Sequence, residues 1–133
     1  MLLILSLAWH LAVFEPPSLC TKIEAPFTQQ IYVRYASSIS GDDKNFLALL
    51  QGENDTFDPL RRSQIYDPRT NSYEDSYGFC QIHRPSHREL VEDPLFFSDP
   101  FWQMERCLEL YKGGTPFGAK KNIPHNKQYF DCP

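Results

Sequence analysis

Residues 43–53 read Asp-Lys-Asn-Phe-Leu-Ala-Leu-Leu-Gln-Gly-Glu. Phe46, Leu49 and Leu50 recur at the spacing of one helix face, and Glu53 occupies the next position of that face. The pattern predicts a helix that ends with a carboxyl group directed towards the core. Burial raises the pKa of a carboxyl group, so Glu53 is a candidate general acid. The alternative is a helix-terminal Glu exposed to water, the usual position of this residue type.

Helix signals elsewhere predict further helices separated by loops, with little strand. Thr28 is expected to cap a helix that runs to about Ser40. Its expected inward residues are Ile31, Tyr32, Tyr35 and Ile39. The helix that ends at Glu53 is expected to begin after a cap at Asp42 or Asp43.

Two more helices are predicted in the second half of the chain. Ser86-His87-Arg88-Glu89 has the form of a capping box and predicts a short helix through Val91. Asp99 followed by Pro100 predicts the start of the longest helix, which is expected to end at Gly113. The apolar stripe of that helix consists of Phe101, Met104, Cys107, Leu108 and Tyr111.

The remaining segments are expected to be loops. Residues 58–76 are rich in Pro, Asp, Asn, Ser and Tyr and predict a long loop with a short hairpin around residues 67–71. A loop of this length usually has a function. The tail, residues 114–133, is expected to be irregular, with the anchors Phe117, Tyr129 and Phe130. The fold class is therefore mainly α, an α+β arrangement in which a small loop or hairpin region flanks a cleft.

Composition limits the classes of function. The chain has 133 residues, of which 41% are hydrophobic, enough for one core and too few for a second domain. The net charge of −4 and the pI near 5.5 argue against nucleic-acid binding, which needs a basic surface. We expect a monomer.

The first 14 residues form an apolar run followed by Glu15-Pro16-Pro17. The run is shorter than the about 20 residues that span a bilayer, and it has the length of a secretory signal without the positive start. We expect residues 1–20 to be a signal peptide or an N-terminal apolar anchor, followed by a domain at residues 26–133. The alternative is a buried N-terminal helix. Export to the periplasm, the cell envelope or the extracellular space is the expectation, with membrane contact only through an uncleaved N-terminal segment.

The cysteines support export. The chain contains Cys20, Cys80, Cys107 and Cys132. In an exported chain cysteines usually form disulfides, and Cys80 and Cys107 lie in segments that should both point inward. We expect these two to form a bridge, with small buried thiols as the alternative. Cys80, His83 and His87 have a loose metal-like spacing, but Pro85 interrupts the histidine pair, so no metal and no cofactor is expected.

Three segments in this order resemble signature segments of the soluble lytic transglycosylase and goose-type lysozyme superfamily. They are Glu53-Asn54-Asp55-Thr56-Phe57-Asp58-Pro59, Ser76-Tyr77-Gly78-Phe79-Cys80-Gln81-Ile82, and the helix from Asp99 to Tyr111. The resemblance covers roughly residues 43 to 112. Asn54 stands where the family usually has Ser. The Ala-Tyr-Asn-Ala-Gly-like segment of many lytic transglycosylases is missing, and residues 111–118 occupy its place.

The resemblance implies a lysozyme-like fold that cleaves the β-1,4 bond between N-acetylmuramic acid and N-acetylglucosamine in peptidoglycan glycan strands. In the transglycosylase route Glu53 acts as general acid and then as base, and the sugar's own 6-hydroxyl closes a 1,6-anhydro ring. In the hydrolytic, muramidase route a second carboxylate positions water. Asp67 and Asp75 are the candidates for it, although each is otherwise an ordinary turn Asp. A third alternative is an inactive wall-binding or interaction module.

The resemblance also implies where the sugar binds. The expected substrate-binding residues are Asn54, Tyr77, Gly78, Gln81 and Ile82. Gly78 lets the main chain approach a ligand closely, and Tyr77 is either a stacking platform or a core aromatic. His83 and Arg84 follow the motif and are candidates for contact with a peptide or lactyl carboxylate of the substrate; the alternative is a loop face exposed to water.

Overall fold

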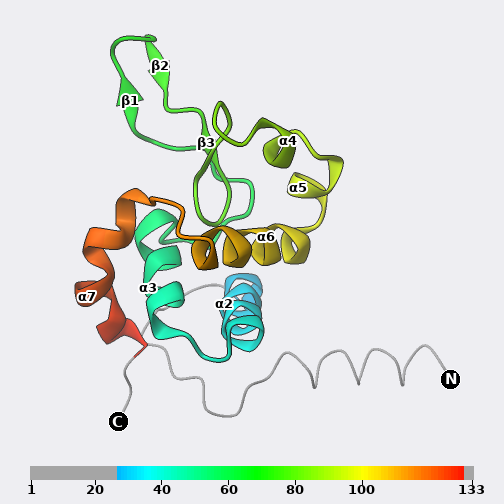
Figure 1. Cartoon of the computed structure of the whole chain (residues 1–133), viewed down its shortest axis with the longest axis vertical. Coiled ribbons are helices and arrows are strands. Elements are labelled where there is room, and N and C mark those ends of the chain that lie inside the picture. Colours follow the sequence, from blue (N-terminus) through cyan, green and yellow to red (C-terminus); the bar gives the residue numbers. More distant parts are fainter. Residues whose placement is uncertain (1–26, 131–133) are drawn as a thin grey trace, which may run out of the picture.

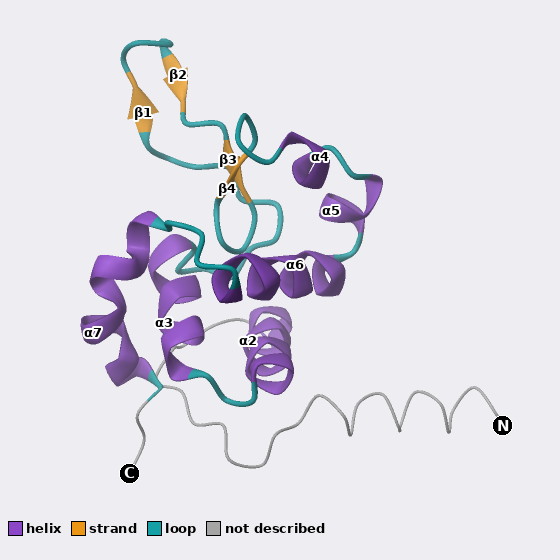
Figure 2. Cartoon of the chain, viewed as in Figure 1, coloured by secondary structure: helices purple, strands orange, loops and turns teal. Residues whose placement is uncertain are grey.

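The computed structural model describes residues 27–130, and helices make up most of this part of the chain (Figure 1, Figure 2). The mainly α class is confirmed. The expected N-terminal segment at residues 1–20 lies outside the described residues, as do Cys20 and Cys132. No helix within residues 27–130 is long and apolar enough to cross a membrane.

Five helices between residues 27 and 112 surround the core. They are α2 (Phe27–Ser40), α3 (Lys44–Glu53), α4 (Arg88–Val91), α5 (Pro94–Ser98) and α6 (Pro100–Lys112). α6 packs against α2 and α5, and α2 also contacts α3. The largest fully buried side chains come from these helices, from the loops between them and from the strand β4 (Ile82–His83): Phe46, Phe57, Phe79, Phe96, Leu47, Leu49, Leu50, Ile82, Met104, Gln103, Val33 and Asn54.

Aspartate caps set the starts of three helices. Asp43 accepts hydrogen bonds from two N–H groups at the start of α3, and Asp99 does the same for α6. Asp42 is not the cap; it has a φ of +59° and accepts a hydrogen bond from the Ser37 hydroxyl. Asp93 caps α5, which the sequence patterns did not predict although Asp93-Pro94 repeats the signal of Asp99-Pro100.

Two expected caps are wrong. α2 begins at Phe27, so Thr28 lies within the helix instead of preceding it. α4 ends at Val91 as expected, but its N-cap is His87, which makes no side-chain capping bond, so Ser86 does not start a capping box. In α2 the fully buried positions Val33 and Ala36 complete the inward face, because tertiary contacts widen the apolar stripe beyond the large residues.

The prediction of an irregular tail is also wrong. Residues 118–129 form three consecutive short helices: η1 (Gly118–Asn122), α7 (Ile123–Asn126) and η2 (Lys127–Tyr129). All three pack against α3, where Figure 1 shows them beside it in orange and red. Phe130 is buried, and Phe117 and Tyr129 pack against the core, so the three anchors are confirmed. The tail is helical because it covers a face of α3, which local sequence propensity does not reveal.

Two small antiparallel hairpins complete the fold. β1 (Tyr66–Asp67) pairs with β2 (Ser72–Tyr73), which confirms the hairpin expected around residues 67–71. β3 (Ser76–Tyr77) pairs with β4 (Ile82–His83) around a turn that contains Gly78. In Figure 2 the β1–β2 hairpin extends away from the helices, while β3 and β4 lie between it and α6.

A buried amide holds the β3–β4 turn on α6. Gln103 is fully buried, its Oε1 accepts the Phe79 N–H at 2.7 Å, and its Nε2 donates to two backbone carbonyls. Gly78 has a φ of +83°, and a Cβ at this position would lie 2.3 Å from the Gln103 Oε1. The expected disulfide between Cys80 and Cys107 is present and joins the same turn to α6, with the Cα atoms 6.1 Å apart.

Candidate active site

Glu53 lies at the edge of a cavity of about 520 Å³. We call it the Glu53 cavity. The end of α3, the β3–β4 hairpin and the segment before η1 form its walls. Its lining residues are Glu53, Ile65, Glu74, Ser76, Gln81, Ile82, His83, Ser86, His87, Leu110, Thr115, Pro116, Phe117 and Gly118.

The helix face that was predicted from the sequence places Glu53 at this cavity. The side chain is half-buried, and the Ala119 N–H donates a hydrogen bond to its Oε1 at 2.9 Å. Burial raises the pKa of Glu53, the Ala119 hydrogen bond opposes that rise, and the negative charge of Glu74 adds to it. The net effect is a raised pKa. Such a carboxyl group holds its proton at a higher pH than an exposed Glu, as a general acid requires.

A glycine permits the close contact between α3 and the tail. A Cβ on Gly52 would lie 2.8 Å from the Ala119 Cβ and 3.1 Å from the Asn126 Nδ2. Any larger residue at this position would push η1 away from the end of α3. The backbone N–H of Ala119 therefore reaches the Glu53 carboxyl group because residue 52 has no side chain.

Glu74 is a second carboxyl group in the Glu53 cavity, and no sequence pattern predicted it. The Ser76 hydroxyl donates to Glu74 Oε1 at 2.7 Å and lies 3.4 Å from His83 Nδ1. Glu74 lies at the bend between β2 and β3, so neither helical nor strand periodicity could have placed it in the cavity.

The two expected second carboxylates do not line the Glu53 cavity. Asp67 lies on the β1–β2 hairpin, where a hydrogen bond from Arg69 lowers its pKa. Burial raises the pKa of Asp75, but hydrogen bonds from Tyr77 and Arg84 outweigh it, so that the pKa lies below its ordinary value. Both aspartates are therefore paired with arginines outside the cavity that contains Glu53.

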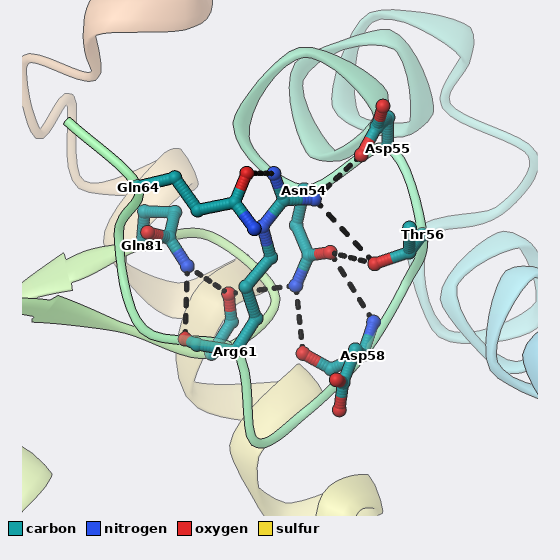
Figure 3. Close-up of polar contacts among 8 residues, drawn as sticks. Asn54, Asp55, Thr56, Asp58, Arg61, Gln64 and Gln81 are labelled. Carbon is teal, nitrogen blue, oxygen red and sulfur yellow. Dashed lines mark hydrogen bonds and ion pairs between the residues drawn. The ribbon is translucent and has the colours of Figure 1, made fainter.

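The side chain of Asn54 links two turns of the fold (Figure 3). Its side chain is fully buried, and Nδ2 donates to the carbonyl oxygens of Asp58 and Gly78 at 2.7 and 3.0 Å. Its Oδ1 accepts from the Thr56 hydroxyl and the Asp58 N–H. With these four bonds Asn54 joins the turn after α3 to the β3–β4 turn, and it does not line the Glu53 cavity.

The other expected binding residues are divided between the cavity and its surroundings. Gln81 and Ile82 line the Glu53 cavity, and Gln81 Nε2 donates to the carbonyl oxygens of Arg61 and Gly78. Gly78 is buried against Gln103 instead. Tyr77 lies outside the cavity, with its ring edge-on to Phe97.

His83 lines the Glu53 cavity, whereas Arg84 binds Asp75 at 2.9 Å outside it. Within residues 27–130 no group of three or more His, Cys, Asp or Glu side chains is arranged to hold a metal ion. The side chains that line the cavity provide two carboxyl groups, three hydroxyls, one amide, two imidazoles and an apolar wall.

No family model matches the chain, and neither a curated protein nor a solved structure matches it. The geometry of the Glu53 cavity and the sequence signatures around it are therefore the basis for a functional proposal. Both concern the same residues, because the first signature begins at Glu53 and the second contributes Ser76, Gln81 and Ile82 to the cavity wall.

Proposed function

We propose that this protein is a lysozyme-like peptidoglycan lytic transglycosylase. It cleaves the β-1,4 bond between N-acetylmuramic acid and N-acetylglucosamine, with Glu53 as general acid and base. The observation that carries the proposal is the half-buried Glu53 carboxyl group at the cavity wall, held by the Ala119 N–H and with a raised pKa. The Cys80–Cys107 disulfide supports an exported protein, since such bridges persist in oxidising compartments.

Glycosidic bond cleavage needs a proton for the leaving oxygen and stabilisation of positive charge on the sugar carbon. Protonated Glu53 donates its proton to the oxygen that leaves with N-acetylglucosamine. The N-acetyl group of the muramoyl sugar stabilises the electron-poor carbon from within the substrate. The carboxylate of Glu53 then removes the proton of the sugar's 6-hydroxyl, whose oxygen bonds to that carbon and closes the 1,6-anhydro ring. Glu53 is protonated again at the end, so one carboxyl group completes the cycle.

The surroundings of Glu53 suit both halves of this cycle. Burial and the charge of Glu74 favour the protonated form before cleavage. The Ala119 N–H lies 2.9 Å from Oε1 and stabilises the carboxylate after the proton has left. Ile65, Leu110 and Phe117 form an apolar wall that suits the neutral faces of sugar rings.

A hydrolytic muramidase is the second candidate, and Glu74 favours it. An inverting hydrolase needs a carboxylate on the opposite side of the sugar to activate water, with the two carboxyl groups roughly 6.5–9.5 Å apart. Glu74 lines the same cavity as Glu53 and is oriented by the Ser76 hydroxyl. In this route Glu74, in place of Asp67 or Asp75, removes a proton from the attacking water.

Digestion of purified peptidoglycan followed by mass spectrometry of the released muropeptides tests the proposal. A transglycosylase releases 1,6-anhydro ends, and a muramidase releases reducing ends that are heavier by one water. We expect anhydro ends from the wild-type protein. Reducing ends would establish the muramidase instead. If no muropeptide is released while the protein still binds the wall, the chain is a wall-binding module.

A further inference from the structure

The β1–β2 hairpin exposes an unusual amount of apolar surface. Ile65, Tyr66 and Tyr73 have exposed fractions of 66%, 52% and 54%. Tyr66 and Tyr73 are cross-strand neighbours whose ring centroids lie 6.0 Å apart, with the rings nearly perpendicular. We call them the tyrosine pair. A two-stranded hairpin gains little stability in water, and exposed aromatic side chains on it are typical of a binding surface.

Contacts within the hairpin hold the tyrosine pair together. The Tyr66 hydroxyl donates a hydrogen bond to Asn71 Oδ1 in the turn. Tyr66 and Tyr73 form a direct cross-strand pair, which is the unit that stabilises a small hairpin. The two rings therefore lie on the same face of the hairpin and present one aromatic surface to a ligand.

The surface beside Tyr66 is continuous with the Glu53 cavity, whereas Tyr73 lines an adjoining hollow that shares Asp67 and Arg69 with that surface. An open hollow of about 590 Å³ follows the hairpin and is lined by Ile65, Tyr66, Asp67, Pro68, Arg69, Glu74 and His83. We call it the hairpin hollow. Ile65, Glu74 and His83 line both spaces, so the hairpin hollow begins where the Glu53 cavity ends. A chain molecule that fills the cavity can continue along the hairpin.

The charges of the hairpin hollow suit an uncharged ligand with many hydroxyl groups. Asp67 and Arg69 neutralise each other through an ion pair at 3.1 Å and still present polar atoms to a ligand. Glu74 adds a carboxylate, which can accept hydrogen bonds from sugar hydroxyl groups. The apolar faces of sugar rings match aromatic side chains, and their hydroxyl and acetamido groups match such polar neighbours. The net charge of −4 disfavours a phosphate backbone as the occupant.

We infer that the hairpin hollow and the tyrosine pair bind the outer sugars of the glycan strand whose scissile bond lies at Glu53. The inference rests on the proposed function and adds that the protein prefers long glycan strands over short fragments. The outer sugars contribute binding energy remote from the reacting bond. That energy holds the scissile bond in place at the cavity and discriminates by chain length.

Binding can be measured without cleavage by using the full chain with Glu53→Gln as the parent. Titration calorimetry with N-acetylglucosamine oligomers, from the disaccharide to the hexasaccharide, gives affinity as a function of length. We expect the parent to bind the hexasaccharide more tightly than the disaccharide. With Tyr66→Ser and Tyr73→Ser added, hexasaccharide affinity should fall about tenfold or more, the factor that corresponds to roughly 1.4 kcal/mol. The disaccharide affinity should not change.

Two further variants separate the ring from its hydroxyl and from general surface effects. Tyr73→Phe keeps the aromatic face and should keep the parent's affinity for the hexasaccharide. Leu60→Ser removes an equally exposed apolar side chain that lines neither the Glu53 cavity nor the hairpin hollow, and it should also leave the affinity unchanged. Unchanged circular dichroism spectra would show that each variant is folded.

The outcomes distinguish the hairpin from the active site. A hexasaccharide affinity that is equal in the parent and in the double serine variant overturns the role of the hairpin, while wall cleavage by wild type keeps the proposed function. An equal loss of affinity for every length also overturns it, because the pair would then act on the cavity itself. A parent that binds no oligomer, together with a wild type that cleaves no peptidoglycan, overturns both.

Discussion

The backbone N–H of Ala119 donates a hydrogen bond to Glu53 Oε1 at 2.9 Å, across 66 positions of sequence. The short helices after Gly118 therefore belong to the candidate active site and are not a loose tail. They pack on α3 and place a hydrogen-bond donor against its last residue. The pKa of Glu53 thus depends on how residues 118–129 pack against α3.

Gly52→Ala is expected to weaken this contact. The new Cβ would meet the Ala119 Cβ at 2.8 Å, so η1 has to move. We expect a net loss of about 1–2 kcal/mol in the free energy of unfolding, because overpacking outweighs the gain in helix propensity. Peptidoglycan cleavage should fall as well. Gly118→Ala is the control for stability alone, since its Cβ would meet nothing within 4 Å but residue 118 lines the Glu53 cavity. Equal stability of the two variants would contradict the role of Gly52.

Glu53→Gln is expected to abolish peptidoglycan cleavage while the protein remains folded and still binds glycan. Glutamine keeps the volume and can still accept the Ala119 hydrogen bond, but it has no proton to give. The rate of muropeptide release should fall by about 10²–10⁴-fold. Asp55→Asn removes the charge of the neighbouring exposed acid and should retain activity. A Glu53→Gln rate above about a hundredth of the wild-type rate would refute the assignment.

The raised pKa of Glu53 also predicts how stability depends on pH. Between the ordinary value of 4.5 and the raised value in the fold, the folded protein binds more protons than the unfolded chain. This group's contribution to the free energy of unfolding therefore falls as pH rises through that window. The free energy of unfolding of Glu53→Gln should equal that of the wild type below this pH window and exceed it above the window. Melting temperatures of the wild type and of Glu53→Gln across pH measure this, and curves that stay parallel throughout would contradict the raised pKa of Glu53.

The parts of the site that the sequence predicted are local. The stripe of Phe46, Leu49 and Leu50 orients Glu53 through helix geometry alone, and Asp43 and Asp99 set helix starts through bonds to N–H groups two or three residues away. The β1–β2 hairpin follows from turn residues in the same way. In each case the sequence segment that determines the local structure is only a few residues long.

The parts that the sequence did not predict depend on distant contacts. Asn54 was expected to bind the substrate, but its side-chain amide donates a hydrogen bond to the carbonyl oxygen of Gly78, 24 positions away in the sequence. Gly78 was expected to let a ligand approach the main chain, but the buried side-chain amide of Gln103 occupies the space where a Cβ would lie. The helices of the tail exist because α3 offers a surface to cover, which no pattern within residues 114–133 shows.

Loss of the Cys80–Cys107 bridge is expected to destabilise the β3–β4 turn on α6. For a separation of 27 positions, the loop-closure entropy corresponds to about 3–4 kcal/mol. The double variant Cys80→Ala/Cys107→Ala should therefore unfold at a lower urea concentration than the wild type. Peptide mapping without reduction should recover the two segments as one linked species. Alkylation of both thiols without prior reduction would contradict the bridge.

Glu74→Gln distinguishes between the two chemical routes. The anhydro route gives Glu74 no obligatory step, so we expect this variant to keep most of the activity and to release anhydro ends. Its pH–rate profile should change, because the charge of Glu74 raises the pKa of Glu53. A general acid is active while protonated, and removing that charge lowers its pKa, so the fall in rate on the alkaline side should move to lower pH.

The control for Glu74 is Asp75, which lines neither the Glu53 cavity nor the hairpin hollow. Asp75→Asn removes one charge from the same region and should keep the wild-type rate and pH profile. Glutamine at position 74 can still accept the Ser76 hydrogen bond, so the wall of the cavity should remain intact. A loss of about a hundredfold or more in Glu74→Gln alone, with reducing ends from the wild type, would make Glu74 the base of a muramidase.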